Sequence, residues 1–136
     1  MSIFDPTRWA SLCVALMCLA VLANPSIASG NDSKKKAIKK DFAAHGDVSC
    51  AQERGEALGL CKASVARGTD GTATVVVRFS NGFARKLYFE ERRFISASAT
   101  MSGVGRDTDW AREGGVHLIR VDDQRYELPD AFVFGD

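Results

Sequence analysis

Apolar and polar residues alternate most clearly over residues 72–89, on either side of Ser80-Asn81-Gly82. A two-residue loop at the Asn-Gly pair would mix polar and apolar side chains on both faces of this hairpin. A three-residue loop instead gathers the large apolar side chains on one face, with Arg85 as the single exception. It also gives the glycine the left-handed conformation of a G1 bulge. We therefore predict the longer loop. Its expected cross-strand pairs are Phe79 with Phe83, Val75 with Leu87, and Ala73 with Phe89.

Shorter alternating runs, bounded by turn residues, predict further strands. Residues 92–100 are placed to pair back on the hairpin, with Phe94 opposite Phe89, and residues 101–109 form a polar, glycine-containing loop. The remaining strands are expected at 110–112, 116–121, 124–128 and 131–134. The second and third of these form a hairpin through Asp122-Asp123, with Ile119, Val121, Tyr126 and Leu128 on one face.

These elements predict a mainly β fold of six to eight short antiparallel strands. The expected architecture is a single meander sheet curled over one core, or a small barrel. One short helix is expected before the strands, over residues 32–44. Its expected N-cap is Asp32 or Ser33, its apolar face is Ile38 and Phe42, and Gly46 is placed to end it.

The first residues of the chain carry the pattern of a secretory signal peptide. An uncharged apolar run over residues 9–23 follows Arg8, and small residues at 26 and 28 suit a cleavage site. The expected organisation is a signal peptide at 1–28, a basic arm with the short helix at 29–45, and a disulfide-stapled β domain at 46–136. Cleavage leaves about 108 residues, enough for one domain.

Two other interpretations of this segment stay open. An uncleaved anchor would need roughly twenty apolar residues. Lysines after the run would also hold its C-terminal side in the cytoplasm under the positive-inside rule. A lipid-modified N-terminus would use Cys18, which follows Met17 inside the apolar run. We favour cleavage, export to the periplasm, and no stable membrane insertion afterwards.

Cysteine usage agrees with an oxidising compartment. Cleavage would remove Cys13 and Cys18, and would leave Cys50 and Cys61 as an even pair. The predicted role of this pair is a structural disulfide. A redox-active pair is disfavoured because such cysteines are usually two residues apart near a helix start. Metal binding is disfavoured because two thiols lack a tetrahedral ligand set.

Charge is close to balanced overall but unevenly distributed, with a formal net charge of +1. Residues 31–40 carry five lysines and one aspartate, whereas residues 107–136 are rich in carboxylates. Nucleic-acid binding is not expected, because it usually needs a basic face with interleaved aromatic residues. The arm is interpreted as a solvated spacer or surface helix, or alternatively as a contact to anionic lipid or glycan polymer.

The sequence carries no recognisable catalytic or cofactor motif. His45 is expected at the end of the short helix, and His117 is expected as a partly buried strand residue rather than a general base. No serine has the strand-turn-helix elbow of a nucleophile. Asp107-Thr108-Asp109 lacks the glycine and the glutamate of a calcium loop. We therefore predict no enzyme activity, no cofactor and no metal.

Four residues are the candidates for binding a partner. Arg78, Lys86 and Tyr88 share the outward face of the predicted hairpin, and arginine and tyrosine often anchor protein interfaces. An ordinary solvated sheet face is the competing interpretation. Trp110 is expected to pack in the core or at a sheet edge, and it becomes a binding residue if it is exposed beside the 101–109 loop.

The runs FSNGFARKLYFE (79–90) and IRVDDQRYELPDAFVFGD (119–136) resemble uncharacterised small exported proteins of Gram-negative bacteria. The resemblance covers most of the mature domain. It implies a periplasmic location and carries over no activity and no functional residue. In size, export and disulfide use the chain is also similar to periplasmic lysozyme inhibitors and immunity proteins, an analogy of type.

Three classes of function remain open. The leading hypothesis is a non-catalytic periplasmic module that binds a protein or envelope polymer, in its most concrete version an inhibitor of a cell-envelope hydrolase. Either the 101–109 loop or the Arg78, Lys86 and Tyr88 face would plug an acidic cleft. The alternative is a structural or assembly factor of the envelope, held near the membrane by its lysines. The third class is an enzyme with an unrecognised site.

Overall fold

The computed structural model describes residues 31–136, and the predicted signal peptide at 1–28 lies outside the described residues. Eight strands and two short helices make up the described part. They are α1 (Asp32–Ile38), β1 (Ala44–Ala51), β2 (Gly59–Arg67), β3 (Ala73–Arg78), β4 (Ala84–Glu90), β5 (Arg93–Ala97), β6 (Thr108–Glu113), β7 (Val116–Val121), β8 (Gln124–Pro129) and α2 (Asp130–Phe134). The predicted mainly β, antiparallel fold is confirmed.

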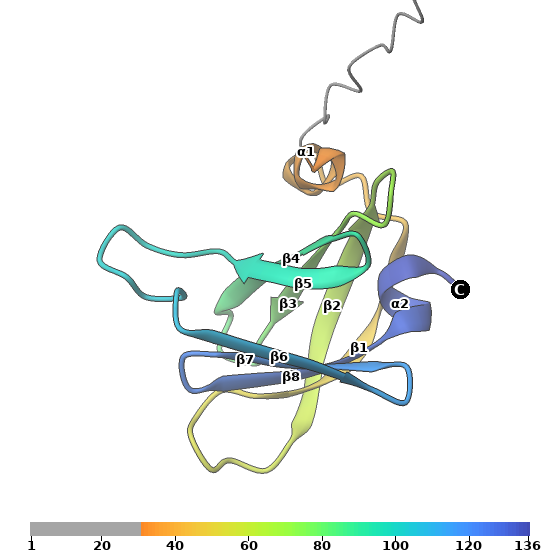
Figure 1. Ribbon diagram of the computed structural model, residues 1–136. Helices are drawn as coiled ribbons and strands as arrows, with labels where there is room; N and C mark the ends of the chain where they lie inside the picture. The colour runs from red at the N-terminus through yellow and green to blue at the C-terminus, as the bar shows by residue number, and fades with distance from the viewer. Residues whose placement is uncertain (1–30) are drawn as a thin grey trace, which may run out of the picture.

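The strands form one nearly closed, barrel-like sheet in the order β5-β4-β3-β2-β1-β8-β7-β6. Strands that follow one another in the chain are neighbours in the sheet, except that β5 and β6 stand at its two open edges (Figure 1). The circle is completed instead between β1 and β8, which pair over Ser49–Glu127, Cys50–Tyr126 and Ala51–Arg125. The molecule is therefore an up-and-down barrel with a seam between β5 and β6.

The central hairpin has the predicted three-residue loop. Ala73 pairs with Phe89 and Val75 with Leu87. The amide of Phe79 donates to the carbonyl oxygen of Phe83 at 2.8 Å. The glycine at 82 has a φ of 89°, the left-handed conformation that the bulge requires. Strict alternation over both strands fixed this register, since a slip of one residue would turn the apolar face outward.

Side chains that point into the barrel form a single core. Inward positions alternate along each strand, and the predicted face of β7 and β8 is buried. The largest side chains of the core are those of Tyr126, Phe89, Leu87, Leu128 and His117, and all five are fully buried. Tyr126 packs against Phe79 with ring centroids 5.8 Å apart. Burial raises the pKa of the Tyr126 phenol. The Tyr126 hydroxyl donates to Gln124 Oε1 at 2.7 Å.

The N-terminal helix is shorter than predicted and uses a different face. It ends at Ile38 rather than at residue 44, and its N-cap is Asn31 instead of Asp32 or Ser33. The residues that it buries are Ser33 and Ala37, whereas Ile38 is 71% exposed. Lys40 has a positive φ of 57°, which ends the helix before the chain enters the sheet.

The segment after the helix is a strand that the sequence did not predict. In β1, Ala44–Ala51, residue 44 already pairs with Val65, so His45 and Gly46 belong to the sheet. Gly46 therefore does not end a helix. The strands on either side of β1, which are β2 and β8, form backbone hydrogen bonds with it. This pairing outweighs the weak strand preference of its glycine and aspartate.

The predicted last strand at 131–134 is wrong: residues Asp130–Phe134 form the helix α2. Gly135 ends it in the left-handed conformation, and its amide donates to the carbonyl oxygen of Ala131 at 2.9 Å. Arg67 donates to the carbonyl oxygens of Phe132 and Val133 at 2.8 and 3.3 Å. A short apolar run fits a strand or a helix equally, so its pattern could not reveal these caps.

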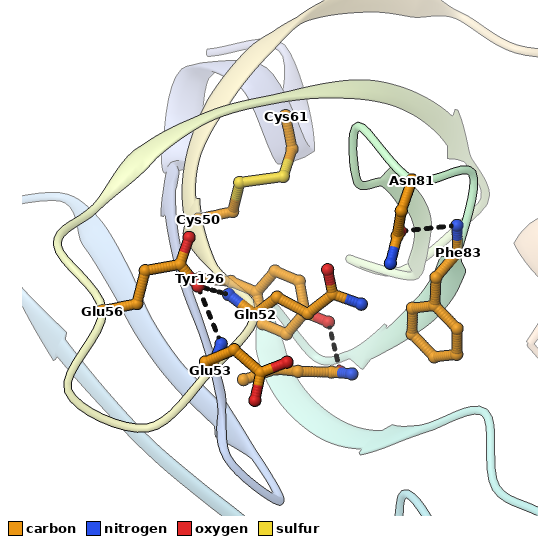
Figure 2. The surroundings of a disulfide bond; sticks show 9 residues. Cys50, Gln52, Glu53, Glu56, Cys61, Asn81, Phe83 and Tyr126 are labelled. Atoms are coloured by element: carbon orange, nitrogen blue, oxygen red, sulfur yellow. Dashed lines mark hydrogen bonds between the residues drawn. A yellow bond between two sulfur atoms is a disulfide. The ribbon is translucent and has the colours of Figure 1, made fainter.

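The predicted Cys50–Cys61 disulfide is confirmed, with the two Cα atoms 5.9 Å apart. It joins β1 to β2 near the loop between them, beside Tyr126 (Figure 2). The Glu56 carboxylate organises that loop by accepting hydrogen bonds from the amides of Gln52 and Glu53 at 3.0 and 2.9 Å. The disulfide therefore links β2 to β1, the strand that pairs with β8.

Candidate functional site

A groove of about 550 Å³ lies on the outer face of β2, β3 and β4, with α1 and the residues that follow it along one side. We call it the basic groove. Its lining combines apolar side chains with cations and hydroxyls. The apolar residues are Ala37, Ile38, Phe42, Val76 and Ala84, the cations are Lys40, Lys62, Arg78 and Lys86, and the hydroxyls are Ser64 and Ser98.

Strand register brings three of these cations together. Lys62 lies directly opposite Arg78 on neighbouring strands, and Arg78 lies one diagonal step from Lys86. Like charges directly opposite each other destabilise a sheet. Lys62 is paired with Asp47 at 2.9 Å. Among residues 31–136 the ion pairs include neither Arg78 nor Lys86, so this positive charge is only partly compensated.

Tyr88 shares the outer face of β4 with Lys86, as predicted, but neither Tyr88 nor Trp110 lines the basic groove. Tyr88 lies under α1, where Lys34 Nζ stands 4.5 Å from the ring centroid and burial raises the pKa of the phenol. Trp110 is half-buried on β6 and packs against the core. Of the four residues singled out from the sequence, three share the outer face of the hairpin, and two of these, Arg78 and Lys86, line the groove.

The loop between β5 and β6, residues 98–107, projects from the barrel (Figure 1). We call it the projecting loop. At its base the buried Arg85 donates to the carbonyl oxygen of Ser98 at 2.6 Å. The amide of Gly105 donates to Asp122 Oδ2 at 2.7 Å. Arg85 is the exception noted in the hairpin pattern, and its guanidinium braces this loop from inside the barrel.

The tip of the projecting loop is also ordered by its own hydrogen bonds. The amide of Thr100 donates to the carbonyl oxygen of Val104 at 2.8 Å, and the Thr100 hydroxyl lies 2.8 Å from that of Ser102. Two apolar side chains stand on this tip in solvent: Met101 is 100% exposed and Val104 is 50% exposed. The loop thus combines fixed backbone with apolar surface that nothing in the described part of the chain covers.

A second cluster of functional groups lies where β6 and β7 meet α2. His117 is fully buried and Nδ1 accepts a hydrogen bond of 3.1 Å from the indole of Trp110, so the ring proton is on Nε2. Nε2 donates to Asp130 Oδ1 at 2.6 Å. Asp130 also accepts from Arg112 Nε at 3.0 Å. We call these four residues the histidine cluster.

Electrostatics hold this cluster in one protonation state. Burial lowers the pKa of His117 more than the Asp130 carboxylate raises it. The Arg112 guanidinium holds the pKa of Asp130 below its usual range. Phe89 and Phe134 pack edge-on against the imidazole, with centroids 5.2 and 5.8 Å away. A neutral, buried imidazole between an indole and a carboxylate serves to join the barrel to α2.

The other groups considered from the sequence lie elsewhere. His45 is on β1, exposed, with Nδ1 2.8 Å from Ser64 Oγ, so its predicted place at a helix end is wrong. Asp107 accepts from Arg120 at 3.1 Å, and this ion pair lowers its pKa. These two groups therefore already have partners within the fold.

Sequence reasoning missed Lys40, Lys62 and Ser64 of the groove, because it defined no strand between the short helix and residue 72. The strand period would have put residues 62 and 64 on the same face as residues 76 and 78, had the β2–β3 register been known. The histidine cluster was missed because Asp130 belongs to a helix that the pattern did not reveal.

Comparison of the chain with protein-family models, curated proteins and solved structures gives no match. Within residues 31–136, neither helix is long and apolar enough to cross a membrane.

Proposed function

We propose that the protein is an exported, non-catalytic binding module of the periplasm that inserts its projecting loop into a protein partner. The concrete version is an inhibitor of a cell-envelope hydrolase. The observation that carries the proposal is the loop at 98–107, whose base is braced by Arg85 and Asp122 and whose tip presents Met101 and Val104 to solvent.

Pre-organisation is the physical reason for choosing this loop. A flexible segment loses conformational freedom when it binds, whereas a loop already held by hydrogen bonds loses little. Its exposed apolar side chains then contribute buried area in the partner's pocket. By contrast, Arg78 and Lys86 line a groove. A concave surface receives a partner rather than plugging one, so the loop is the better plug of the two surfaces considered from the sequence.

The class of partner follows from chemistry. Enzymes that cleave glycosidic bonds carry paired carboxylates in their clefts. The projecting loop includes the exposed Arg106 beside its apolar tip. A cation next to apolar side chains complements an acidic cleft, where electrostatic attraction raises the association rate and shape fit supplies affinity.

Export is the second part of the proposal. The apolar run and small residues of the first 28 positions suit a cleaved signal peptide. A disulfide between Cys50 and Cys61 suits the oxidising periplasm. Intact mass of the protein from its native host tests this directly. Cleavage near residue 28 and a two-dalton shift on reduction are expected, whereas an uncleaved, reduced chain in the membrane fraction would contradict export.

Inhibition is tested with purified protein against a panel of peptidoglycan hydrolases. We expect tight one-to-one inhibition of at least one hydrolase. Met101→Asp with Val104→Asp should weaken that inhibition at least tenfold. Leu60→Asp is the matched control, because Leu60 is an exposed apolar residue on β2 away from the loop. Inhibition that survives the loop substitutions, or no binding to any hydrolase of the panel, overturns the proposal.

The alternative function is a membrane-proximal structural factor of the envelope. One observation favours it: Lys39 and Lys40 are exposed next to Ile38, an arrangement of cations beside an apolar side chain. Co-sedimentation with anionic vesicles separates the two functions. Loss of co-sedimentation in Lys39→Glu/Lys40→Glu, with hydrolase inhibition absent, supports the structural role. Unchanged sedimentation removes it.

A further inference from the structure

The basic groove on the outer face of β2, β3 and β4 meets the projecting loop only at Ser98, and the function proposed above does not use it. Its position results from how α1 covers the sheet. Ser33 hydrogen-bonds to Thr74 at 2.8 Å, which places the helix over the row that contains Thr74 and Tyr88. The two rows beyond it, which include Val76 with Lys86 and Lys62 with Arg78, are left open.

The cations of the groove are concentrated more than the fold requires. Lys62 and Arg78 stand directly opposite each other, an arrangement that costs stability unless anions compensate both charges, and Asp47 pairs with Lys62 alone. Local features that lower stability, and that no other interaction within the fold compensates, are typical of functional sites. Arg78 makes one hydrogen bond within the described chain, to the carbonyl oxygen of Gly82 at 3.0 Å. It therefore retains donors for a ligand.

The other half of the lining is apolar. Val76 and Ala84 form the floor on the sheet, and Ala37, Ile38 and Phe42 form the side contributed by α1 and its following residues. A volume of about 550 Å³ is in the range of sites that hold small molecules. Free phosphate or a simple polyanion would leave this apolar surface in water, whereas an apolar ligand would leave the cations without a partner.

We propose that the basic groove binds a single-chain anionic lipid. The acyl chain lies on the apolar floor, and the phosphate or carboxylate head lies among Lys62, Arg78 and Lys86. Charge complementarity with these three cations selects an anionic head over a zwitterionic one. The Ser98 hydroxyl lines the same groove and accepts from the Lys86 amide at 3.1 Å, so its own proton is left to donate to the head.

The test is a titration of the protein with lysophosphatidic acid below its critical micelle concentration, followed by calorimetry and by amide shifts in NMR spectra. Three other probes are titrated in parallel. Lysophosphatidylcholine has the same chain with a zwitterionic head, glycerol 3-phosphate has the head alone, and polyglutamate has the charge of an acidic polypeptide. We expect lysophosphatidic acid to bind at least tenfold more tightly than each of them, with shifts centred on Val76, Ala84 and Lys86.

Variants locate the site. Arg78→Glu/Lys86→Glu should weaken lysophosphatidic acid binding at least tenfold, and Ala84→Trp should weaken it by filling the floor. Arg54→Glu/Arg93→Glu changes the net charge equally at exposed positions outside both the groove and the projecting loop, and should leave binding unchanged.

Three results would overturn the proposal. Equal affinity for both lysophospholipids would mean that the cations do not select the head. Tighter binding of polyglutamate would assign the groove to an acidic polypeptide, and equal binding of glycerol 3-phosphate would assign it to free phosphate. None of these results bears on hydrolase inhibition by the projecting loop, so the two proposals succeed or fail separately.

Discussion

The indole of Trp110 on β6 donates its proton to Nδ1 of His117 on β7, at 3.1 Å, with the two rings stacked at a centroid distance of 6.0 Å. This hydrogen bond needs an unprotonated Nδ1, while the other ring nitrogen donates to Asp130. Protonating the imidazole would place two donors face to face in a buried site. The folded state therefore requires a neutral His117, and protonation of this side chain at low pH destabilises the fold.

We expect the protein to lose stability as the pH falls from about 7 to about 5 because of His117. Burial lowers the pKa of His117 in the folded state below the value of about 6.5 in an unfolded chain. At higher pH the imidazole is neutral in both states and its contribution is fully present. As the pH falls, the unfolded chain takes up the proton first, so the free energy of unfolding decreases. Urea denaturation across this range measures the loss.

A variant and a titration check this pH dependence. His117→Asn should flatten the dependence between about pH 7 and pH 5. An NMR titration of the folded wild type checks the same point without a variant. A His117 resonance that titrates at or above about pH 6.5 would contradict the assignment.

A further loss is expected in stronger acid, from Asp130. The Arg112 guanidinium lowers the pKa of this carboxyl in the folded state. Its contribution is therefore present above the unfolded value of about 3.9 and is lost as the pH falls below it. Asp130→Asn should remove this second phase of the urea-midpoint profile. Asp123→Asn is the control, since Asp123 is an exposed carboxylate paired with Arg54.

Arg85 should prove essential to the base of the projecting loop. Arg85→Met keeps the apolar stem but removes the guanidinium donor of the Ser98 carbonyl, and leaves Gln124 Oε1 with the Tyr126 hydroxyl alone. We expect a loss of about 2–3 kcal/mol in the free energy of unfolding, the scale for unpairing buried polar groups. Amide exchange over residues 99–106 should also accelerate.

The control for Arg85 is an arginine on the opposite face of the sheet. Arg78→Met should change stability by less than about 0.5 kcal/mol, because Arg78 is exposed. Equal effects of the two substitutions, or unchanged exchange in the loop of Arg85→Met, would show that Arg85 does not brace it.

The sequence identifies strands where alternation is strict on both sides of a turn. This holds for residues 72–89, where apolar residues at every second position fix the register and even single out Arg85. It fails for β1, Ala44–Ala51, whose glycine, aspartate and serine carry little pattern of their own. That strand forms because partners on both sides satisfy its backbone, and those partners lie outside the segment whose pattern was read.

The candidate site was predictable only in part for the same reason. Arg78 and Lys86 share a strand face that the hairpin register makes visible. The contribution of Lys62 depends on the β2–β3 pairing, and that of Lys40 depends on where α1 ends. The bracing of the projecting loop joins Gly105 to Asp122 across the β5–β6 seam, a contact that no periodicity encodes.

Helix α1 gives a direct test of which face holds it to the sheet. Ala37 is buried against the sheet, whereas Ile38, the anchor expected from spacing, is 71% exposed. Ala37→Lys should lower the free energy of unfolding by about 2 kcal/mol, because it places a further positive charge at a buried position beside the cations of the basic groove. Ile38→Ser should change it by less than about 0.5 kcal/mol. Urea denaturation measures both effects. A larger loss of stability from the substitution at Ile38 than from that at Ala37 would show that Ile38 holds the helix to the sheet.

Loss of the disulfide should cost about 3 kcal/mol on the chain-entropy model, since it closes a short loop. The bonded cysteines are 11 positions apart. Urea denaturation of Cys50→Ala/Cys61→Ala measures the cost. Reductant should bring the wild-type midpoint down toward that of the variant and leave the variant unchanged. A reductant-induced shift in the variant would mean that the loss has another source.

The pairing of β1 with β8 gives this molecule an unusual folding problem. Every other strand pairing joins consecutive strands, so short loops can form them one after another. The β1–β8 pairing joins residues 49–51 to residues 125–127, the two ends of the barrel's strand sequence, and it spans only three residue pairs. Ring closure therefore depends on a late encounter between distant segments, and its central residue is Cys50. The disulfide holds β1 to β2 whether or not β8 is paired, so it limits how far the docking strand can move away when the ring opens.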